Sequence, residues 1–486
     1  MIYKDYIQKH AAEAPREAVF LLREGQERKE ITWERFFSDI NALGTGLVDG
    51  HPGARIGILG ENSYQWALIH MTAVLGAGAA VPLDRDQRED TLASQIRTTE
   101  CSLVFYSAQY RKKARRLEEM LDKTCFICWD EEEFDKMLEL GNAELERGND
   151  QYISLRPGEE DLACIIFTSG TTGGPKGVML SQKNIVSMVS AALELLDLAP
   201  GDRCLLVLPL YHCYGCFYNL YAGLAARCVQ CICPDLKRLS QQIVFFQARI
   251  LFLVPVVVEA LLTELERSGM SAEEFFGGSL KWVMSAGAPI SPQIIKRFGK
   301  HGVDVLNGYG ITECTAIVSL NPRRAFRADT VGLPGKNWDV KIAEDGEICV
   351  SGSNVMMGYY GDGESRQAVM DGPWFRTGDL GYLDQDGHLV ISGRKKNLII
   401  LSNGKNVSPE ELEEQIHRME GVKEVLVYEK DKKITAEVYT ELSEEALSAE
   451  MALLNRKLPA YDRIQQVLIR DTAFEKTGGQ KIKRRR

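Results

Sequence analysis

The sequence predicts an α/β protein with a large N-terminal domain of layered sheets and helices, a small β-barrel-like part, and a small α+β domain at the C-terminus. Three observations support this. Apolar runs alternate with amphipathic helical stretches over the first two thirds of the chain, short alternating strands begin at Gly346, and a compact mixture of helices and strands follows position 396. The 486 residues, 45% of them hydrophobic, are enough for roughly three domains.

The N-terminal elements alternate between strand and helix. Five apolar runs are typical of strands: 54–60, 80–84, 102–107, 161–167 and 177–180. The stretch 62–78 is typical of a helix. Ser181 is expected to cap a further helix, since its hydroxyl can accept a backbone N–H. One face of that helix collects the apolar residues Ile185, Met188, Val189, Ala192, Leu195 and Leu196.

Further elements are expected after residue 130. The acidic stretch 130–151 is typical of a solvated helix and connector. Alternating residues and Gly or Asp turns predict antiparallel strands at 346–352 and 387–393. The C-terminal elements are expected in the order helix 408–419, strand 422–430, strand 433–442 and helix 449–458.

Charge and composition exclude several classes. A net charge of −10 argues against a dedicated nucleic-acid binder. The one basic cluster is the tail 481–486, which is typical of a solvated end, with contact to phosphates as the alternative. The first residues carry charges and no apolar core of a signal peptide. The longest apolar run, 250–262, is too short for a bilayer and contains Pro255. We therefore expect a cytoplasmic protein without a transmembrane segment.

Twelve cysteines in such a chain are expected to be reduced and mostly buried. Cys213, Cys216, Cys228 and Cys231 form two C-x2-C pairs, a spacing that zinc sites use. Because both pairs lie among apolar residues, a buried strand around 228–233 is the favoured interpretation, and structural zinc is the alternative.

The loop "FTSGTTGGPKG" at 167–177 carries four glycines, four hydroxyl side chains and one lysine, a composition that favours phosphate binding. It is not a Walker A loop, because Pro175 and Gly177 stand where that motif needs Gly and Ser or Thr. It also joins strand to strand, so backbone N–H groups, hydroxyls and Lys176 must bind phosphate without a helix terminus behind them.

Four further motifs follow in order: "NGYGITECT" at 307–315, "WFRTGDLGYLDQDG" at 374–387, "GRKKNLIILSNGKNVSPEELE" at 393–413 and "FEKTGGQKIKR" at 474–484. With the loop, they resemble the adenylate-forming (AMP-binding) superfamily of acyl-CoA synthetases, nonribosomal adenylation domains and luciferases. The form "SNGKNVSPEELE" is most similar to the fatty acyl-CoA synthetase branch. The resemblance covers nearly the whole chain.

The resemblance implies an AMP-forming acid–thiol ligase that uses ATP, Mg²⁺ and coenzyme A. A carboxylate attacks the α-phosphorus, pyrophosphate leaves, and a thiol then takes the acyl group from the adenylate. Such in-line displacement relies on positioning and charge neutralisation.

The resemblance also implies site residues. The phosphate loop would bind ATP through Thr168, Ser169, Gly170, Thr171, Thr172 and Lys176. Mg²⁺ would be held by Glu313 and Thr168, which offer the hard oxygen ligands that this ion prefers. The adenosine part would contact Gly287, Ala288, Asn307, Tyr309, Gly310, Thr312, Asp379 and Arg394. Tyr309 offers a face for adenine, and Asp379 two acceptors for the ribose.

Two residues are implied to be catalytic. His212 matches a gate near the substrate carboxylate. Lys481 would bridge that carboxylate and the α-phosphate, although Glu475 and Gln480 replace the proline and glycine of the family pattern. Lys481 lies on a small mobile domain, 396–486, which would swing about a hinge near Lys396 after adenylation, leaving 1–395 as the N-terminal domain. Asn403 replaces a glycine expected along the thiol path, and Gly404 follows it.

The substrate is expected to be a fatty or aryl carboxylic acid. No aspartate lies between Tyr211 and Tyr221 to pair with an amino group, and an unpaired buried ammonium is costly. The acceptor is coenzyme A or, as the alternative, an acyl carrier protein. Two other classes stay open: a binding protein that has lost turnover, which the departures at 403, 475 and 480 keep in view, and a phosphotransferase that releases ADP.

Overall fold

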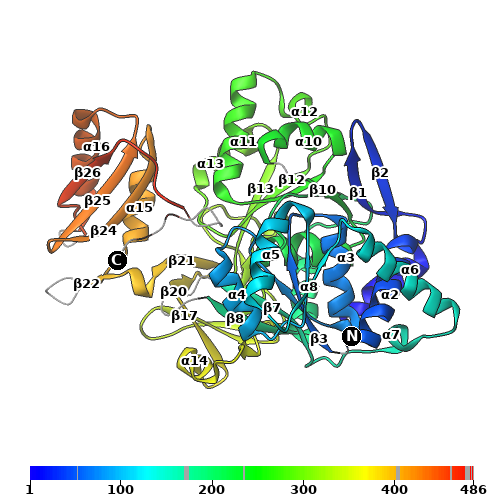
Figure 1. Ribbon diagram of the computed structural model, residues 1–486. Coiled ribbons are helices and arrows are strands. Elements are labelled where there is room, and N and C mark those ends of the chain that lie inside the picture. Colours follow the sequence, from blue (N-terminus) through cyan, green and yellow to red (C-terminus); the bar gives the residue numbers. More distant parts are fainter. Residues whose placement is uncertain are drawn as a thin grey trace.

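The structure is a computed structural model that describes residues 1–51, 53–168, 175–233, 236–400, 406–459, 462–476, 482 and 484. Figure 1 shows two large sheets with helices around them, a smaller sheet below, and the C-terminal elements as a separate lobe. The layered α/β architecture predicted from the alternation of elements is confirmed.

The first large sheet has nine strands. Their order across the sheet is β15 (Leu333–Pro334), β14 (Ser319–Leu320), β13 (Asp304–Tyr309), β12 (Trp282–Ser285), β11 (Ile250–Leu253), β9 (Arg203–Leu206), β10 (Val229–Ile232), β1 (Ala18–Glu24) and β2 (Glu27–Thr32). The run from β13 to β1 is parallel, and an antiparallel pair lies at each edge. The carboxyl ends of the central strands therefore meet at one edge, where open α/β sheets bind their ligands.

The second large sheet has seven strands. Their order is β18 (Gly358–Tyr359), β8 (Lys176–Ser181), β7 (Leu162–Thr168), β4 (Gly78–Pro82), β3 (Ala54–Leu59), β5 (Leu103–Tyr106) and β6 (Cys125–Cys128). The strands β7 and β8 are antiparallel neighbours, which confirms that the glycine-rich loop joins strand to strand.

Helices lie between and around the sheets of the molecule. In the described part of the chain they are α1 (Tyr3–Glu13), α2 (Trp33–Gly50), α3 (Tyr64–Thr72), α4 (Glu89–Thr98), α5 (Arg111–Met120), α6 (Glu132–Glu146), α7 (Gln151–Ser154), α8 (Gln182–Leu195), α9 (Gly223–Ala225), α10 (Leu239–Phe246), α11 (Pro255–Ser268), α12 (Ala272–Phe275), α13 (Pro292–Lys300), α14 (Gly363–Val369), α15 (Pro409–His417) and α16 (Glu444–Lys457). Two π-helical segments, η1 (Ala73–Ala77) and η3 (Gly215–Ala222), continue this set.

The layers follow from the apolar faces. Side chains of α2, α3, α8 and η3 share one core with both large sheets, so these helices lie between them. The helices α10, α11 and α13 pack on the other face of the nine-stranded sheet, and α4 and α5 on the other face of the seven-stranded sheet. The Ser181 hydroxyl accepts the Asn184 N–H, which confirms the predicted cap of α8.

The predicted small β-barrel-like part is an antiparallel sheet. It contains β16 (Trp338–Ile342), β17 (Glu347–Gly352), β20 (Trp374–Leu383), β19 (Met370–Asp371) and β21 (Leu389–Arg394). The register places Asp379 of β20 opposite Arg394 of β21. The two successive motifs at 374–387 and 393–413 therefore meet on neighbouring strands.

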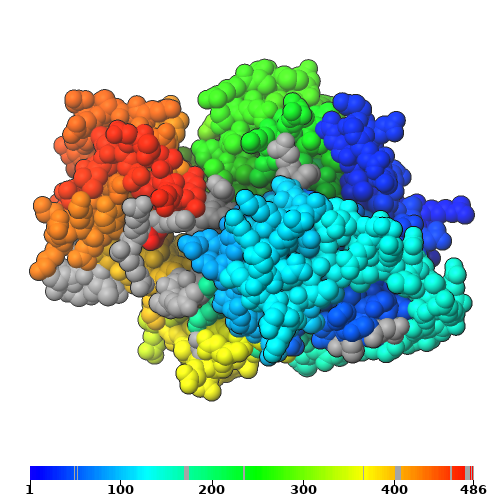
Figure 2. All heavy atoms as spheres, viewed as in Figure 1, coloured from blue at the N-terminus to red at the C-terminus, as the bar shows by residue number. Residues whose placement is uncertain are grey.

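The C-terminal elements have their own core. The strands β24 (Val422–Lys430), β25 (Lys433–Thr440) and β26 (Gln466–Arg470) form one sheet, and α15 and α16 bury apolar side chains against it. A two-stranded ladder, β22 (Ile399–Ile400) with β23 (Asn406–Val407), precedes them. Figure 2 shows these residues, in orange and red, as a lobe beside the rest of the molecule. The predicted order of helices and strands is confirmed, with β26 in addition.

The cysteines lie mainly inside these layers. Cys125 is exposed, and the other eleven are buried free thiols. Cys213 and Cys216 lie at the start of η3, whereas Cys228 and Cys231 lie at β10. The short buried strand predicted around 228–233 is confirmed as β10. Within the described ranges, no three His, Cys, Asp or Glu side chains gather as metal ligands would.

Candidate active site at the meeting point of three sheets

The phosphate-loop residues begin and end on paired strands. Thr168 closes β7 and Lys176 opens β8, and the two face each other across the ladder. This pairing brings the hydroxyl and the ammonium to the two ends of one hairpin loop. Four predicted loop residues lie outside the described residues: Ser169, Gly170, Thr171 and Thr172.

A chain of contacts links Lys176 to Glu313. The Lys176 Nζ lies 4.9 Å from the centre of the Tyr359 ring and 3.7 Å from an Asp362 carboxylate oxygen. The Tyr359 hydroxyl donates to Glu313 Oε1 at 3.1 Å. Tyr359 was not among the residues predicted from the sequence. Its position follows from the pairing of Tyr359 with Val178 of β8, just after Gly358, which has φ +146°.

Asp379 lies at the centre of a second set of contacts. Its Oδ2 accepts the Tyr309 hydroxyl at 2.6 Å, and its Oδ1 accepts the Arg394 Nε at 2.6 Å. The structure therefore brings together three predicted residues from β13, β20 and β21. Each carboxylate oxygen keeps a second lone pair, so Asp379 can still accept from a ligand.

The two sets of contacts form one electrostatic site. Burial raises the pKa of Glu313, while the Tyr359 hydrogen bond and the Arg394 charge oppose that rise. Burial disfavours the Arg394 guanidinium, but Asp379 raises its pKa. The site therefore holds a partly desolvated carboxylate beside a guanidinium that stays charged.

The adenosine-contact residues follow neighbouring strand ends. Ser285 of β12 lies opposite Asn307 of β13, which places residues 287–288 and 309–310 at the same edge. Gly287 has φ +85°, a conformation that favours glycine. At Gly310 a Cβ would lie 1.8 Å from the Ala316 carbonyl oxygen, so only glycine fits.

Asn307 supports this edge from inside. Its amide donates to the Thr330 carbonyl at 2.8 Å, and its side-chain oxygen accepts from Asn321 at 2.8 Å. The predicted ATP contact of Asn307 therefore competes with two internal hydrogen bonds. In this structure its side chain fixes the segment that follows β14.

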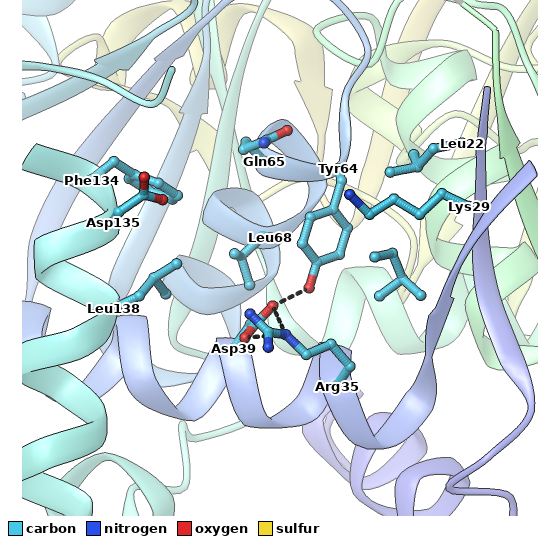
Figure 3. A pocket seen from close by; sticks show the side chains of 11 residues that line it. Leu22, Lys29, Arg35, Asp39, Tyr64, Gln65, Leu68, Phe134, Asp135 and Leu138 are labelled. Carbon is cyan, nitrogen blue, oxygen red and sulfur yellow. Dashed lines mark hydrogen bonds and ion pairs between the residues drawn. The ribbon is translucent and has the colours of Figure 1, made fainter. Parts of the chain in front are cut away.

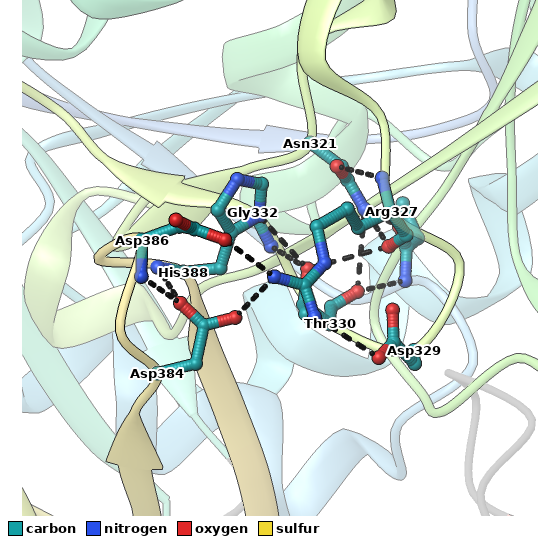
Figure 4. A network of polar contacts seen from close by, with 9 residues as sticks. Asn321, Arg327, Asp329, Thr330, Gly332, Asp384, Asp386 and His388 are labelled. Carbon is teal, nitrogen blue, oxygen red and sulfur yellow. Dashed lines mark hydrogen bonds and ion pairs between the residues drawn. The ribbon is translucent and has the colours of Figure 1, made fainter.

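That segment is tied to the strands that carry Asp379 and Arg394. Figure 4 shows Arg327 extending toward the turn between β20 and β21, where its Nη1 lies 2.7 Å from Asp384 and 3.2 Å from Asp386. Arg327 also pairs with Asp329 at 3.2 Å, and His388 lies 3.1 Å from the Thr330 hydroxyl. This network connects the edge of the nine-stranded sheet to the five-stranded sheet.

His212 lies in the turn that precedes η3. The side chain is exposed, and its Nδ1 accepts the Tyr214 N–H at 3.2 Å. The next residue, Cys213, accepts the Thr312 hydroxyl at 3.3 Å. The turn that carries His212 is thereby joined to the segment that carries Glu313.

The predicted hinge lies next to a dense ion-pair network. Lys396 lies within the short 3₁₀ segment η7 (Lys395–Asn397). The Lys395 Nζ contacts Asp345 at 2.6 Å and the buried Glu347 at 3.0 Å. Burial opposes the ionised form of Glu347, but Lys395 and Arg376 lower its pKa. The predicted catalytic Lys481, together with Asn403, Gly404 and Gln480, lies outside the described residues.

A separate cavity of about 520 Å³ lies between the β1–β2 hairpin, α2, α3 and α6. Figure 3 shows its floor, where Asp39 accepts the Tyr64 hydroxyl at 2.7 Å and pairs with Arg35 at 2.9 Å. No candidate site residue named above lines it. The contacts of Asp39 satisfy a buried carboxylate within the fold.

In a layered α/β fold, polar residues at the carboxyl ends of the strands are typical of a ligand-binding site. The model of the AMP-binding enzyme family matches residues 7–360. The chain therefore belongs to the AMP-binding enzyme family.

Three similar proteins illustrate the relationship. The long-chain-fatty-acid–CoA ligase FadD15 of Mycobacterium bovis is 26% identical over 80% of this chain and 73% of its own. The anthranilate CoA ligase AuaEII, solved with anthranoyl-AMP, has a TM-score of 0.87 at 20% identity, over 99% of this chain and 95% of its own. The o-succinylbenzoate CoA synthetase of Bacillus subtilis, solved with ATP and magnesium, has a TM-score of 0.81 at 22% identity, over 98% of each chain.

The family, fold and enzyme class expected from the sequence are thereby confirmed: an ATP-dependent, AMP-forming acid–CoA ligase. In the part of the chain that the structure describes, no helix is long and apolar enough to cross a membrane.

Proposed function

We propose that this chain joins a compact carboxylic acid to coenzyme A in two steps. First, a carboxylate oxygen attacks the α-phosphorus of ATP, the bond to the bridging oxygen breaks, and pyrophosphate leaves. Then the thiolate of coenzyme A attacks the acyl carbon of the adenylate, and AMP leaves with the electron pair. The supporting observation is the convergence of Lys176, Glu313, Asp379 and Arg394 from three sheets.

The roles follow from chemistry and position. Thr168 and Lys176 would hold the β- and γ-phosphates, because they open and close the hairpin loop that contains the remaining hydroxyls. Tyr309 would stack on adenine, with backbone at Gly287 and Ala288 approaching the other face. Asp379 would accept the ribose hydroxyls while Arg394 keeps its charge balanced.

The donor set near the loop fits magnesium. Glu313 is a half-buried carboxylate linked through Tyr359 to Lys176, and Thr168 ends the strand beside Lys176. Magnesium takes one or two carboxylates and completes its shell with phosphate oxygens and waters. When bound, the ion would neutralise charge on the phosphates, and Glu313 would orient it.

This assignment has a direct test. Glu313→Gln should raise the magnesium concentration needed for half-maximal ATP–pyrophosphate exchange by about tenfold, because an amide is a weaker ligand for a hard cation. Glu364→Gln, on the exposed start of α14, is the matched control. Equal magnesium dependence of both variants would remove Glu313 as a ligand.

The acid pocket favours a compact or aryl acid over a long chain. The Tyr214 hydroxyl donates to the Met284 carbonyl at 2.8 Å, and the Tyr218 hydroxyl to the Ala316 carbonyl at 3.3 Å. The Tyr214 ring also lies 4.0 Å from the position of a Cβ at Gly287. We propose that these two anchored rings line the acid site and limit its depth.

Lys481 would bring its ammonium to the α-phosphate during adenylation, and rotation about Lys396 would then move 396–486 so that the thiol can enter. The separate core of the C-terminal lobe supports this division from 1–395. Lys395, next to the hinge, forms ion pairs with Asp345 and Glu347. During the rotation these ion pairs must either break and be replaced or move with the hinge.

An acid panel tests the proposal as a whole. Benzoate, cinnamate, hexanoate and palmitate are each incubated with ATP and magnesium, and the adenylate is trapped with hydroxylamine. We expect hydroxamate from the aryl and short acids. Parallel reactions with coenzyme A and with a carrier protein identify the acceptor, and we expect thioester with coenzyme A. Hydroxamate from no acid would instead support a binding protein, and ADP as product a phosphotransferase.

A further inference from the structure

Both ends of the segment that contains Lys481 are held by acidic residues of the C-terminal lobe. Lys476 and Ile482 form an antiparallel bridge, so the neighbours of residues 477–481 lie next to each other. Those five residues lie outside the described part of the chain. The contacts of Lys476 and Arg484 therefore determine where the segment starts and returns.

Arg484 holds the returning end. Its Nη2 lies 2.5 Å from Glu413 Oε2 and 3.3 Å from Glu410 Oε1, and its Nη1 donates to the Val427 carbonyl at 3.0 Å. The other oxygen of Glu413 accepts the Val427 N–H at 2.7 Å. Glu413 thus joins α15, β24 and the tail, and the expectation that the tail is solvated is wrong at Arg484.

Glu424 holds the entering end. Its Oε1 lies 2.7 Å from the Lys476 Nζ, and its Oε2 accepts the Phe474 N–H at 2.7 Å. The side chains of Glu424 and Lys476 are 14% and 24% exposed, so water screens this pair only partly. A charge-assisted pair in such surroundings is stronger and better ordered than a surface pair.

We propose that Glu413 and Glu424 are positioning residues for adenylation: they fix the two ends of residues 477–481, and so fix the approach of Lys481 to the reacting phosphate. This inference rests on the proposed function of Lys481. We call Glu413, Glu424, Lys476 and Arg484 the tail clamp. Glu413 and Glu424 touch neither ATP nor acid and act through the tail alone.

The tail clamp has a specific consequence for the two half-reactions. Lys481 is needed only in adenylation, whereas thioester formation uses another face of the lobe. Loss of the tail clamp should therefore slow the first step and spare the second. A displacement of about 1 Å at a reacting group costs up to about a hundredfold in rate.

The experiment uses the full chain and an acid that the wild type activates. Glu413→Gln, Glu424→Gln and Glu414→Gln are compared in ATP–pyrophosphate exchange and in thioester formation from supplied acyl-adenylate. Glu414 is the matched control, because it is the next residue on α15 and pairs with Arg418 on the exposed face. We expect exchange to fall about tenfold in each tail-clamp variant, with thioester formation within about twofold and Glu414→Gln unchanged.

Arg484→Gln is the second route to the same answer if Glu413→Gln fails to fold, because it removes the other partner of that pair near the chain end. Its exchange rate should fall by the same factor, and combining it with Glu413→Gln should add little further loss. Equal loss of both half-reactions, or exchange equal to Glu414→Gln, would overturn the tail clamp. Absence of exchange in the wild type with every acid would instead overturn the proposed function itself.

Discussion

The strand-end site and the tail clamp place charged groups in different ways. At the strand ends, Asp379 and Arg394 occupy neighbouring strands whose register fixes their separation, and the Tyr309 hydroxyl reaches Asp379 from β13 of another sheet. In the tail clamp, ion pairs hold Lys476 and Arg484, which flank an isolated antiparallel bridge between Lys476 and Ile482. A sheet register involves many backbone hydrogen bonds, whereas an ion pair depends on the protonation of two side chains. Geometry at the strand ends should therefore withstand changes that open the tail clamp.

The largest expected effect concerns the cation that the tail clamp positions. Lys481→Ala should reduce ATP–pyrophosphate exchange by about a thousandfold, because a single charge-stabilising donor in a transition state contributes this much. Thioester formation from supplied acyl-adenylate should be largely spared. Lys483→Ala, two residues further along, is the control. If both half-reactions fall together, the tail serves the lobe as a whole and the comparison fails.

The next effect tests the strand-end site. Asp379→Asn removes the anionic partner of the half-buried Arg394 and weakens the acceptor for ribose, so kcat/KM for ATP should fall about tenfold to a hundredfold. Steady-state kinetics with varied ATP measures this change. Asp386→Asn, in the exposed turn between the same two strands, should leave kcat/KM unchanged. A similar loss in both variants would mean that the strands, and not the Asp379 carboxylate, are responsible.

The pH dependence of ATP–pyrophosphate exchange tests the tail clamp separately from the strand-end site. Burial raises the pKa of Glu413 to about 7, although Arg484 and the Val427 N–H favour its ionised form and Glu410 opposes it. Glu413 is therefore fully ionised, and can form its ion pair with Arg484 in every molecule, only above this pH. Exchange should rise by up to about tenfold through pH 7 in the wild type, and this rise should be absent in Glu413→Gln. A rise retained in Glu413→Gln would assign it to another group.

Stability should change in the opposite direction over the same range. The folded state keeps the Glu413 proton up to about pH 7, whereas an ordinary glutamate releases it near 4.5. Because the folded state then binds more protons than the unfolded state, the contribution of Glu413 to the free energy of unfolding falls as pH rises from 4.5 to 7. Denaturant unfolding of wild type and Glu413→Gln across this window checks the sign.

The smallest effect concerns the surface network of Figure 4. Arg327 contacts Asp329, Asp384 and Asp386 in an exposed position, so its ion pairs are screened by water. Arg327→Gln should lower the melting temperature by only about 1–3 °C and leave ATP–pyrophosphate exchange unchanged. A marked loss of exchange would mean that this network positions Asp379 and Arg394 from a distance.

Much of this arrangement was predictable from the sequence. Alternating apolar runs determined the order of strands and helices, because each element must bury one face. The hairpin at 167–177 followed from two apolar runs around glycines, and the Ser181 cap from its hydroxyl before a helical face. Motif residues such as Glu313 and Asp379 were identifiable because their motifs resemble those of the adenylate-forming superfamily, and their carboxylate oxygens suit magnesium and ribose.

Other features were decided by contacts between distant segments. Tyr359 lies between Lys176 and Glu313 because β18 pairs with β8, and nothing local to either strand specifies that pairing. Arg484 looks like part of a solvated basic tail until the fold brings α15 and β24 beside it.

The sequence by itself thus determined the family, the succession of elements and the residue types of the chemistry, since these depend on local periodicity and on the chemical groups present. Only the tertiary structure decided which partner each charge has and how strongly it is buried. Pairing and burial depend on distances between residues that are far apart along the chain, and those distances exist only in the folded state.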